Sequence, residues 1–240
     1  MSRTPLYKKI KEQIIQSLVA GEWQPGDMIP NEKQLSERFG VAISTIRAAI
    51  GELVSADVLV RVQGKGTFVT RHSDQNAYRF FNLYQSDGNR ATFFRQLIKI
   101  KRETPTAETI RLLQLNESED SVFKLRLHIN SHNAIIAVSD LTVPERLFPD
   151  LDKRMVIEGD KSLYDVFQTT YNVNVVRIVE QLAAEKPPAA VAKILGLKPN
   201  ESSLQVKRTA YTFSNQPIEF RITWIQTKNH HYLISRGDAS

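Results

Sequence analysis

The sequence predicts an α+β protein with two domains, a winged helix-turn-helix over residues 1–70 and a mixed α/β domain over residues 79–240. Two observations carry this prediction. Residues 30–69 contain two amphipathic helical patterns separated by a glycine, and two short β-branched segments follow them. A polar linker at residues 71–78 comes next, and beyond it several segments have the period of two that is typical of strands.

The first helix of the N-terminal domain is predicted from a regular apolar spacing. Leu6, Ile10, Ile14 and Leu18 recur every fourth residue, so they lie on one face of a helix. Gly21 and the turn residues after it end this helix. The face made by the four apolar residues is expected to pack in the core of the domain.

The second helix is predicted from its N-terminal cap. Asn31 is a favoured capping residue, and Glu32 lies in the first turn, where its charge complements the helix dipole. Leu35 and Phe39 are expected to point to the core, and Gly40 supplies the turn before the next helix.

The third helix and the hairpin after it complete the domain. Ile46, Ile50 and Leu53 share the buried face of the helix. The segments Val58–Val62 and Thr67–Val69 are short, rich in β-branched residues and separated by a glycine-containing turn, which predicts a hairpin. Helices and hairpin in this order form a winged helix-turn-helix, which places one helix in a DNA major groove and a wing beside it.

Residues from Pro5 to Val69 resemble the DNA-binding domain of the GntR family of bacterial transcription regulators. The resemblance rests on P-L-Y-K-K-I, G-E-W-Q-P-G-D-M-I-P, the helix-turn-helix and G-K-G-T-F-V, in that order. The family usually has Ser and then Arg after the turn valine, whereas Ala42 and Ile43 follow Val41 here. Ala42 therefore lacks a capping side chain, worth roughly 1 kcal/mol. Ile43 lacks a guanidinium, so the preferred operator is expected to differ from the usual family site.

The resemblance also implies which residues contact double-stranded DNA. Arg47 is the one side chain at the start of the recognition helix that can form a bidentate pair with guanine. The wing tip combines small residues with the ammonium group of Lys65, which suits minor-groove and phosphate contacts. The alternative is that Arg47 and Lys65 are only solvent-exposed charges on a helix and a turn. The residues expected at DNA are Lys33, Ser44, Thr45, Arg47, Gln63, Gly64 and Lys65.

The second domain is predicted to mix strands and helices. The predicted strands cover residues 79–84, 93–100, 121–129, 133–143, 203–213 and 218–225. The predicted helices cover residues 105–113, 162–171 and 188–195.

Residues 76–234 resemble the ligand-sensing UTRA domain found in the HutC branch of the GntR family, whose fold is similar to that of chorismate lyase. The resemblance rests on T-A-E, L-R-L-H, V-P-E-R-L-F-P-D-L, K-S-L-Y-D-V-F, A-A-V-A-K-I-L-G-L and Q-P-I-E-F-R. The family usually carries Arg-x-Arg on one strand, whereas Arg126 is followed by His128 here. The family often has a carboxylate on the next strand, and the corresponding position in this sequence is Ser139 or Asp140, depending on where a one-residue shift is placed.

A small anionic effector is the ligand that the polar residues of this domain predict. Guanidinium groups pair bidentately with carboxylate or phosphate, and carboxylates accept hydrogen bonds from hydroxyl or amino groups. The alternative is that Arg126 and Glu219 form an ordinary cross-strand ion pair on a hydrated face. The residues expected at the effector are Arg126, His128, Asp140, Tyr164, Glu219 and Arg221.

Composition excludes several chemistries. The 240 residues contain no cysteine, which excludes disulfides, thiol chemistry and Cys-ligated metals. We expect no cofactor. We also expect no metal, because His230 and His231 are adjacent and would point to opposite faces of a strand, where they could not bind one metal ion. The formal net charge is +6, but residues 1–75 carry only about +2 of it, so the motif and not the charge predicts DNA binding. No apolar run approaches about 18 residues, so a cytoplasmic location without membrane contact is expected.

The sequence as a whole predicts a homodimeric repressor that binds an inverted-repeat operator and is released by the effector. Two alternatives remain. A chorismate-lyase-like enzyme is conceivable from the fold, although we find no paired acid and base or activated nucleophile, and we therefore expect no enzyme activity. An architectural DNA-binding protein without a ligand is the other.

Overall fold

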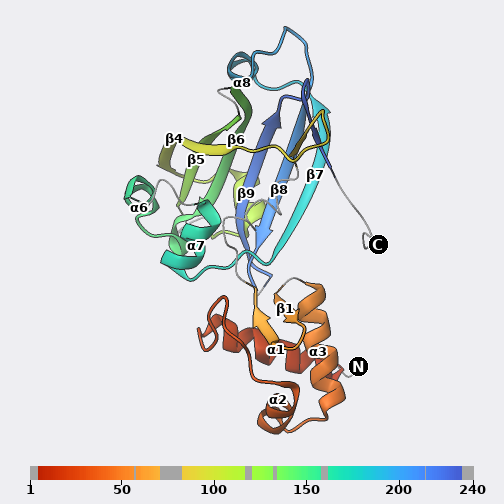
Figure 1. Cartoon of the computed structure of the whole chain (residues 1–240). Helices are drawn as coiled ribbons and strands as arrows, with labels where there is room; N and C mark the ends of the chain where they lie inside the picture. The colour runs from red at the N-terminus through yellow and green to blue at the C-terminus, as the bar shows by residue number, and fades with distance from the viewer. Residues whose placement is uncertain are drawn as a thin grey trace.

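The computed structural model describes two bodies of unequal size joined end to end (Figure 1). The smaller is helical and carries a hairpin, and the larger contains a six-stranded antiparallel sheet. Within the described part of the chain, no helix combines the length and apolar character needed to cross a membrane. The described residues are 5–56, 58–70, 83–116, 121–131, 134–157, 162–213 and 215–233.

The smaller body is the predicted winged helix-turn-helix. Its elements are α1 (Leu6–Val19), α2 (Glu32–Phe39), α3 (Ile43–Ser55), β1 (Leu59–Val62) and β2 (Gly66–Val69). The first helix buries Ile10, Ile14 and Leu18, as their spacing predicts, but the expectation for Leu6 is wrong, because this first residue of the helix is 53% exposed. These side chains pack with Ile46 and Ile50 of α3 in one hydrophobic core.

The caps of α2 and α3 follow the predictions from single residues. The side chain of Asn31 accepts from Gln34 N at 2.9 Å, and Gln34 Oε1 accepts from Asn31 N at 2.9 Å, which forms a capping box. Gly40 ends α2 in the left-handed region, at φ 64°. Ala42 makes no capping hydrogen bond at the start of α3. The missing cap of the recognition helix is therefore confirmed.

The larger body is built on one sheet with the strand order β4-β5-β6-β9-β8-β7. Its strands are β4 (Phe94–Glu103), β5 (Val122–Ser131), β6 (Ala134–Pro144), β7 (Arg177–Glu185), β8 (Ser203–Tyr211) and β9 (Pro217–Ile225). A separate pair joins β3 (Leu83–Gln85) to β10 (His230–Tyr232). The helices are α5 (Ala107–Leu113), η2 (Glu145–Leu147), α6 (Leu151–Ile157), α7 (Leu163–Tyr171) and α8 (Ala189–Ile194).

The two faces of the sheet are covered by different helices. We call inner the face against which α6 and α7 pack, where Leu125 and Leu141 meet Phe148 and Phe167 in the main core. The rings of Phe148 and Phe167 stack with their centroids 4.0 Å apart. The opposite, outer face is covered at Phe220 by α5 and at Trp224 by α8. The inner face therefore holds the larger core.

The two bodies touch at the end of the sheet. Val176, before β7, and Phe213, after β8, pack against the core of the winged helix-turn-helix. A cavity of about 510 Å³ lies at this junction, between α1 and α3 on one side and Thr212, Phe213 and Asn215 on the other. The predicted linker at residues 71–78 lies outside the described residues.

The second domain contains four elements that were not predicted from the sequence, η2, α6, β7 and β10. The other strands and helices predicted in the second domain are present, with ends shifted by a few residues. The first predicted strand is described only from Leu83 onward.

Candidate DNA-binding surface and effector pocket

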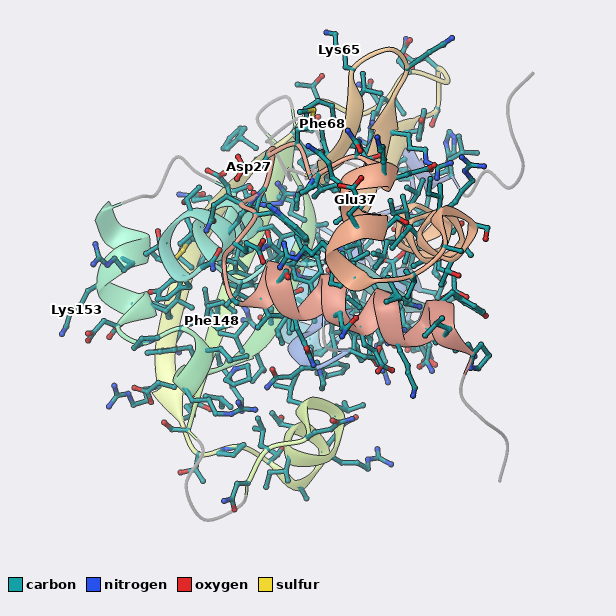
Figure 2. The ribbon with its side chains drawn as sticks, turned by 90° about the horizontal axis from the view of Figure 1, so that it is seen from below. Asp27, Glu37, Lys65, Phe68, Phe148 and Lys153 are labelled. Atoms are coloured by element: carbon teal, nitrogen blue, oxygen red, sulfur yellow. The ribbon has the colours of Figure 1, made fainter. Side chains whose placement is uncertain are left out.

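The residues predicted to contact DNA lie together on the exposed side of the smaller body. Ser44 and Arg47 are exposed and Thr45 is half-buried at the start of α3, and Lys33 is exposed in the first turn of α2. The wing tip at Gln63, Gly64 and Lys65 is also exposed, and Gly64 has a φ of 72° that favours glycine. Lys65 lies at the end of the hairpin and points away from the body of the protein (Figure 2).

A groove of about 570 Å³ runs between the start of α2 and the wing. Glu32 and Arg61 line it together with the three wing-tip residues. The α2 N-terminus and the hairpin therefore form one continuous concave surface beside α3.

Glu32 binds two arginines from different elements of this surface. Arg47 donates from Nε and Nη2 to Glu32 Oε2 at 3.0 and 2.8 Å. Arg61 of β1 donates from Nη2 to Glu32 Oε1 at 3.4 Å. The hydrogen bond from Arg47 to Glu32 raises the pKa of the Arg47 guanidinium, which stays charged. The sequence reading missed Arg61, although its place on the wing strand, two residues before the tip, was a usable signal.

The inner face of the sheet carries a buried ionic cluster. Arg221 donates from Nε and Nη2 to the two carboxylate oxygens of Glu219 at 2.7 and 2.8 Å. Tyr164 donates to Glu219 Oε1 at 3.1 Å. Arg208, on the neighbouring strand, donates from Nε to Glu180 Oε1 at 2.8 Å. Glu219 is fully buried, and Tyr164, Arg208 and Arg221 are each at least nine-tenths buried.

Burial and charge oppose each other in this cluster. Burial lowers the pKa of Arg221, but attraction to Glu219 and Tyr164 and the hydrogen bond to Glu219 together outweigh it and raise the pKa overall. The pKa of Arg208 is likewise lowered by burial and raised more strongly by the combined effect of Tyr164, Glu180, Tyr232 and Glu219. Burial, followed by repulsion from Glu219, raises the pKa of the Tyr164 phenol. The arginines are therefore charged and the tyrosine is protonated at neutral pH.

A small cavity adjoins this cluster. Arg208, Arg221, Tyr164, Ser162 and Arg95 line it, and its volume is about 20 Å³, close to that of one water molecule. Ser162 caps α7 by accepting from Asp165 N at 3.1 Å, which fixes Tyr164 at the start of that helix. Three guanidinium groups, a hydroxyl and a phenol thus converge at one point. The sequence reading missed Arg208 and Arg95.

Arg126 and Asp140 lie on the outer face of the sheet. Arg126 donates from Nε and Nη2 to the two oxygens of Asp140, both at 2.7 Å. Strand pairing sets Arg126 opposite Asp140, and Asp140 opposite Ile222. Arg221, one residue earlier than Ile222, therefore points to the inner face.

The predicted effector residues are consequently divided between two places. Tyr164, Glu219 and Arg221 meet on the inner face, and Arg126, His128 and Asp140 lie on the outer face. The cross-strand pair between Arg126 and Glu219 that we considered from sequence does not form, because each residue has a different partner.

The outer site is wider and more open than the inner one. A cavity of about 350 Å³ adjoins the ion pair and is lined by Lys99, Lys101 and Lys124 as well. Burial and the neighbouring guanidinium of Arg126 lower the pKa of His128. Among the described residues, no group of three or more His, Cys, Asp and Glu side chains is placed to hold a metal ion.

Comparisons with known proteins agree with this architecture. Residues 6–69 match the family described as bacterial regulatory proteins, gntR family, and residues 94–231 match the UTRA domain. The HTH-type transcriptional repressor NagR of Bacillus subtilis is 26% identical over an alignment of 248 positions, gaps included, which covers 99% of this chain and 93% of that protein. The histidine utilization repressor of Pseudomonas aeruginosa is 27% identical over 210 residues, which span 87% of this chain and 82% of that protein.

A solved structure has a fold similar to that of the larger domain. It is described as the ligand-binding domain of a GntR-family transcriptional regulator from Bordetella bronchiseptica. It superposes with a TM-score of 0.62 and 28% identity, over 67% of this chain and 99% of that one.

Together these findings define a DNA-binding transcription regulator with a separate effector domain, and not an enzyme. The chain belongs to the GntR family and carries a UTRA domain after its winged helix-turn-helix.

Proposed function

We propose that the protein is a homodimeric cytoplasmic repressor that binds an inverted-repeat operator and is released from it by a small anionic metabolite. The observation that carries the effector proposal is the convergence of Arg95, Arg208 and Arg221 with Tyr164 and Ser162 on the inner face. Guanidinium groups are the preferred partners of carboxylate and phosphate, and burial strengthens such contacts. An anion that enters this site would displace the carboxylate of Glu219 or Glu180 and accept hydrogen bonds from the same guanidinium donors.

The path from the effector site to DNA is short in sequence. Glu219 and Arg221 lie on β9, and the turn that precedes this strand contains Phe213, which packs on the DNA-binding domain. A ligand that moves the start of β9 would therefore act on the junction between the two bodies. Such coupling has a typical size of about 1–3 kcal/mol, and it arises only if the ligand prefers one of the two arrangements.

The outer cavity is the second candidate for the effector site. Its volume of about 350 Å³ lies in the range of small-molecule pockets, whereas the inner cavity must expand to hold more than a few atoms. The predicted contacts Arg126, His128 and Asp140 belong to this alternative.

Operator release by small anions tests the function and separates the two sites. An operator is first selected from random duplex DNA, and fluorescence anisotropy then follows its binding against a panel of sugar phosphates, dicarboxylates and inorganic phosphate. At least one anion is expected to lower operator affinity by about 5- to 150-fold and to raise the melting temperature. Tyr164→Phe, which keeps the ring and removes the hydroxyl, should weaken this response without changing operator affinity in the absence of ligand.

Arg126→Ala is the matched variant on the outer face, and it should leave both the response and the affinity unchanged. The opposite pattern, with Arg126→Ala unresponsive and Tyr164→Phe normal, would move the effector to the outer cavity. A protein that binds its operator but responds to no anion, in either affinity or melting temperature, would favour the architectural alternative.

Dimerisation is the second part of the proposal. One winged module presents a single recognition helix, and helix-turn-helix proteins reach specific affinity by reading two half-sites related by two-fold symmetry. We expect the dimer to form largely through residues 79–240. Light scattering should give twice the mass of one chain, both free and on DNA, and a monomer in both states would contradict the proposal.

A further inference from the structure

We infer that Glu32 is a positioning residue for operator discrimination, and that it acts by holding Arg47 of the recognition helix and Arg61 of the wing in one fixed arrangement. Its carboxylate accepts from Arg47 at 3.0 and 2.8 Å and from Arg61 at 3.4 Å. One side chain from α2 therefore ties α3 to the wing, and the wing forms the other side of the groove. The inference rests on DNA binding by this surface and is independent of the effector site.

The backbone of Glu32 is itself fixed. Asn31 and Gln34 close the capping box around the first turn of α2, so Glu32 starts from a rigid helix end. Its side chain is 29% exposed, against 64% for Arg47 and 48% for Arg61. The carboxylate thus lies behind the two guanidinium groups, which are the outermost part of the cluster.

The hydrogen bonds of Arg47 leave its reading function free. Glu32 occupies Nε and one hydrogen of Nη2, so Nη1 and the second hydrogen of Nη2 can still donate. Guanine offers two acceptors, O6 and N7, side by side in the major groove. A guanidinium whose other edge is already bound loses less conformational freedom when it meets that base.

The charge of Glu32 predicts opposite effects on specific and nonspecific binding. A carboxylate close to the DNA surface repels phosphates, so it weakens binding to every sequence. If it also orients Arg47 and Arg61, its loss removes more from operator binding than from binding to unrelated DNA. A carboxylate that only masks the two arginines would do the reverse, because its loss would free them for the operator.

Glu32→Ala is the test, and Glu22→Gln is the control for the loss of one negative charge. Glu22 pairs with Arg38 in the same domain, outside the groove, and the control removes the same single negative charge. Affinities for the selected operator and for an unrelated duplex are measured over a range of salt concentrations. Glu32→Ala should lower the ratio of operator to unrelated affinity by about tenfold or more, while Glu22→Gln leaves it unchanged. Glu32→Gln keeps one oxygen acceptor and should recover part of the ratio.

A double-mutant cycle separates positioning from a general structural effect. In the Arg47→Ala background, Glu32→Ala should change the ratio by much less than in the wild type, because the residue on which it acts is missing. If Glu32→Ala alone raised the affinity for both duplexes equally, Glu32 would act only by repelling phosphates. If it raised the affinity for the operator more than for the unrelated duplex, Glu32 would act by masking the two arginines. Either result overturns the inference. Failure of the wild-type protein to select any operator would instead contradict DNA recognition by this surface. Circular dichroism and melting curves confirm that each variant is folded.

Discussion

Glu219→Ala should lower the free energy of unfolding of the effector domain by about 3–5 kcal/mol, the largest effect that we expect from a single substitution. Glu219 is fully buried and accepts hydrogen bonds from Arg221 and Tyr164. Its removal leaves the guanidinium of Arg221 buried beside like-charged Arg208, without the carboxylate that now neutralises it. A buried charge that loses its partner is far more costly than an exposed one.

Arg126→Ala is the contrasting variant, because it also breaks a bidentate pair. The side chains of Arg126 and Asp140 are 35% and 41% exposed, so water replaces much of the lost interaction. The expected change is about 0–1 kcal/mol. Urea unfolding followed by tryptophan fluorescence measures both variants, and equal losses in the two would show that the inner cluster is hydrated and not buried. Glu219→Gln keeps the shape and isolates the contribution of the charge.

The winged helix-turn-helix could be predicted in detail because its signals are local. The four-residue spacing of Ile10, Ile14 and Leu18 defines a buried helical face without reference to any other element. Asn31 and Gly40 determine where α2 begins and ends, through one capping box and one left-handed residue. Neither inference depends on long-range contacts.

The strand β7 was missed because its sequence lacks a buried face. It is an edge strand, and the side chains of Arg177–Glu185 are exposed or half-buried along its length. Its second half, L-A-A-E, has residues that favour helices. Only pairing with β8 makes it a strand, and the sequence of β7 by itself does not contain that information.

The division of the effector residues between two faces depends on register. Alternation correctly places Glu219 with Arg221, and Arg126 with His128, since each pair lies on one strand. Whether given residues of two different strands lie on the same face depends on how the strands are paired. Bulges interrupt the pairing of β4 with β5, β5 with β6, and β8 with β9. A shift of one residue exchanges the faces, so the composition of a site across strands could not be derived from the sequence.

One buried residue of the proposed effector site did leave a signal in the sequence. Arg208 alternates with Val206 and Ala210 on β8, and both of these neighbours are buried. A charged side chain in phase with apolar ones on a strand predicts a buried cation, which requires anionic partners. The structure supplies them as Glu180 and, through the adjacent strand, Glu219.

Arg47→Ala should reduce affinity for the selected operator by about 1–3 kcal/mol and relax the base preference at the position that Arg47 reads. The side chain is 64% exposed and pairs only with Glu32 among the described residues, so its loss should leave the melting temperature unchanged. Electrophoretic mobility shifts with single-base variants of the operator measure the loss of preference.

Lys65→Ala provides the comparison, because its ammonium lies at the wing tip and suits phosphate more than base contacts. It should weaken binding to all DNA sequences alike and reduce the slope of log affinity against log salt concentration by about one. The two variants thus separate base reading from charge, since Arg47→Ala changes the order of preferred sequences and Lys65→Ala does not. Unchanged operator affinity and base preference in Arg47→Ala would mean that α3 does not enter the major groove in the expected orientation, and the recognition surface would have to be rebuilt around Lys33 and the wing.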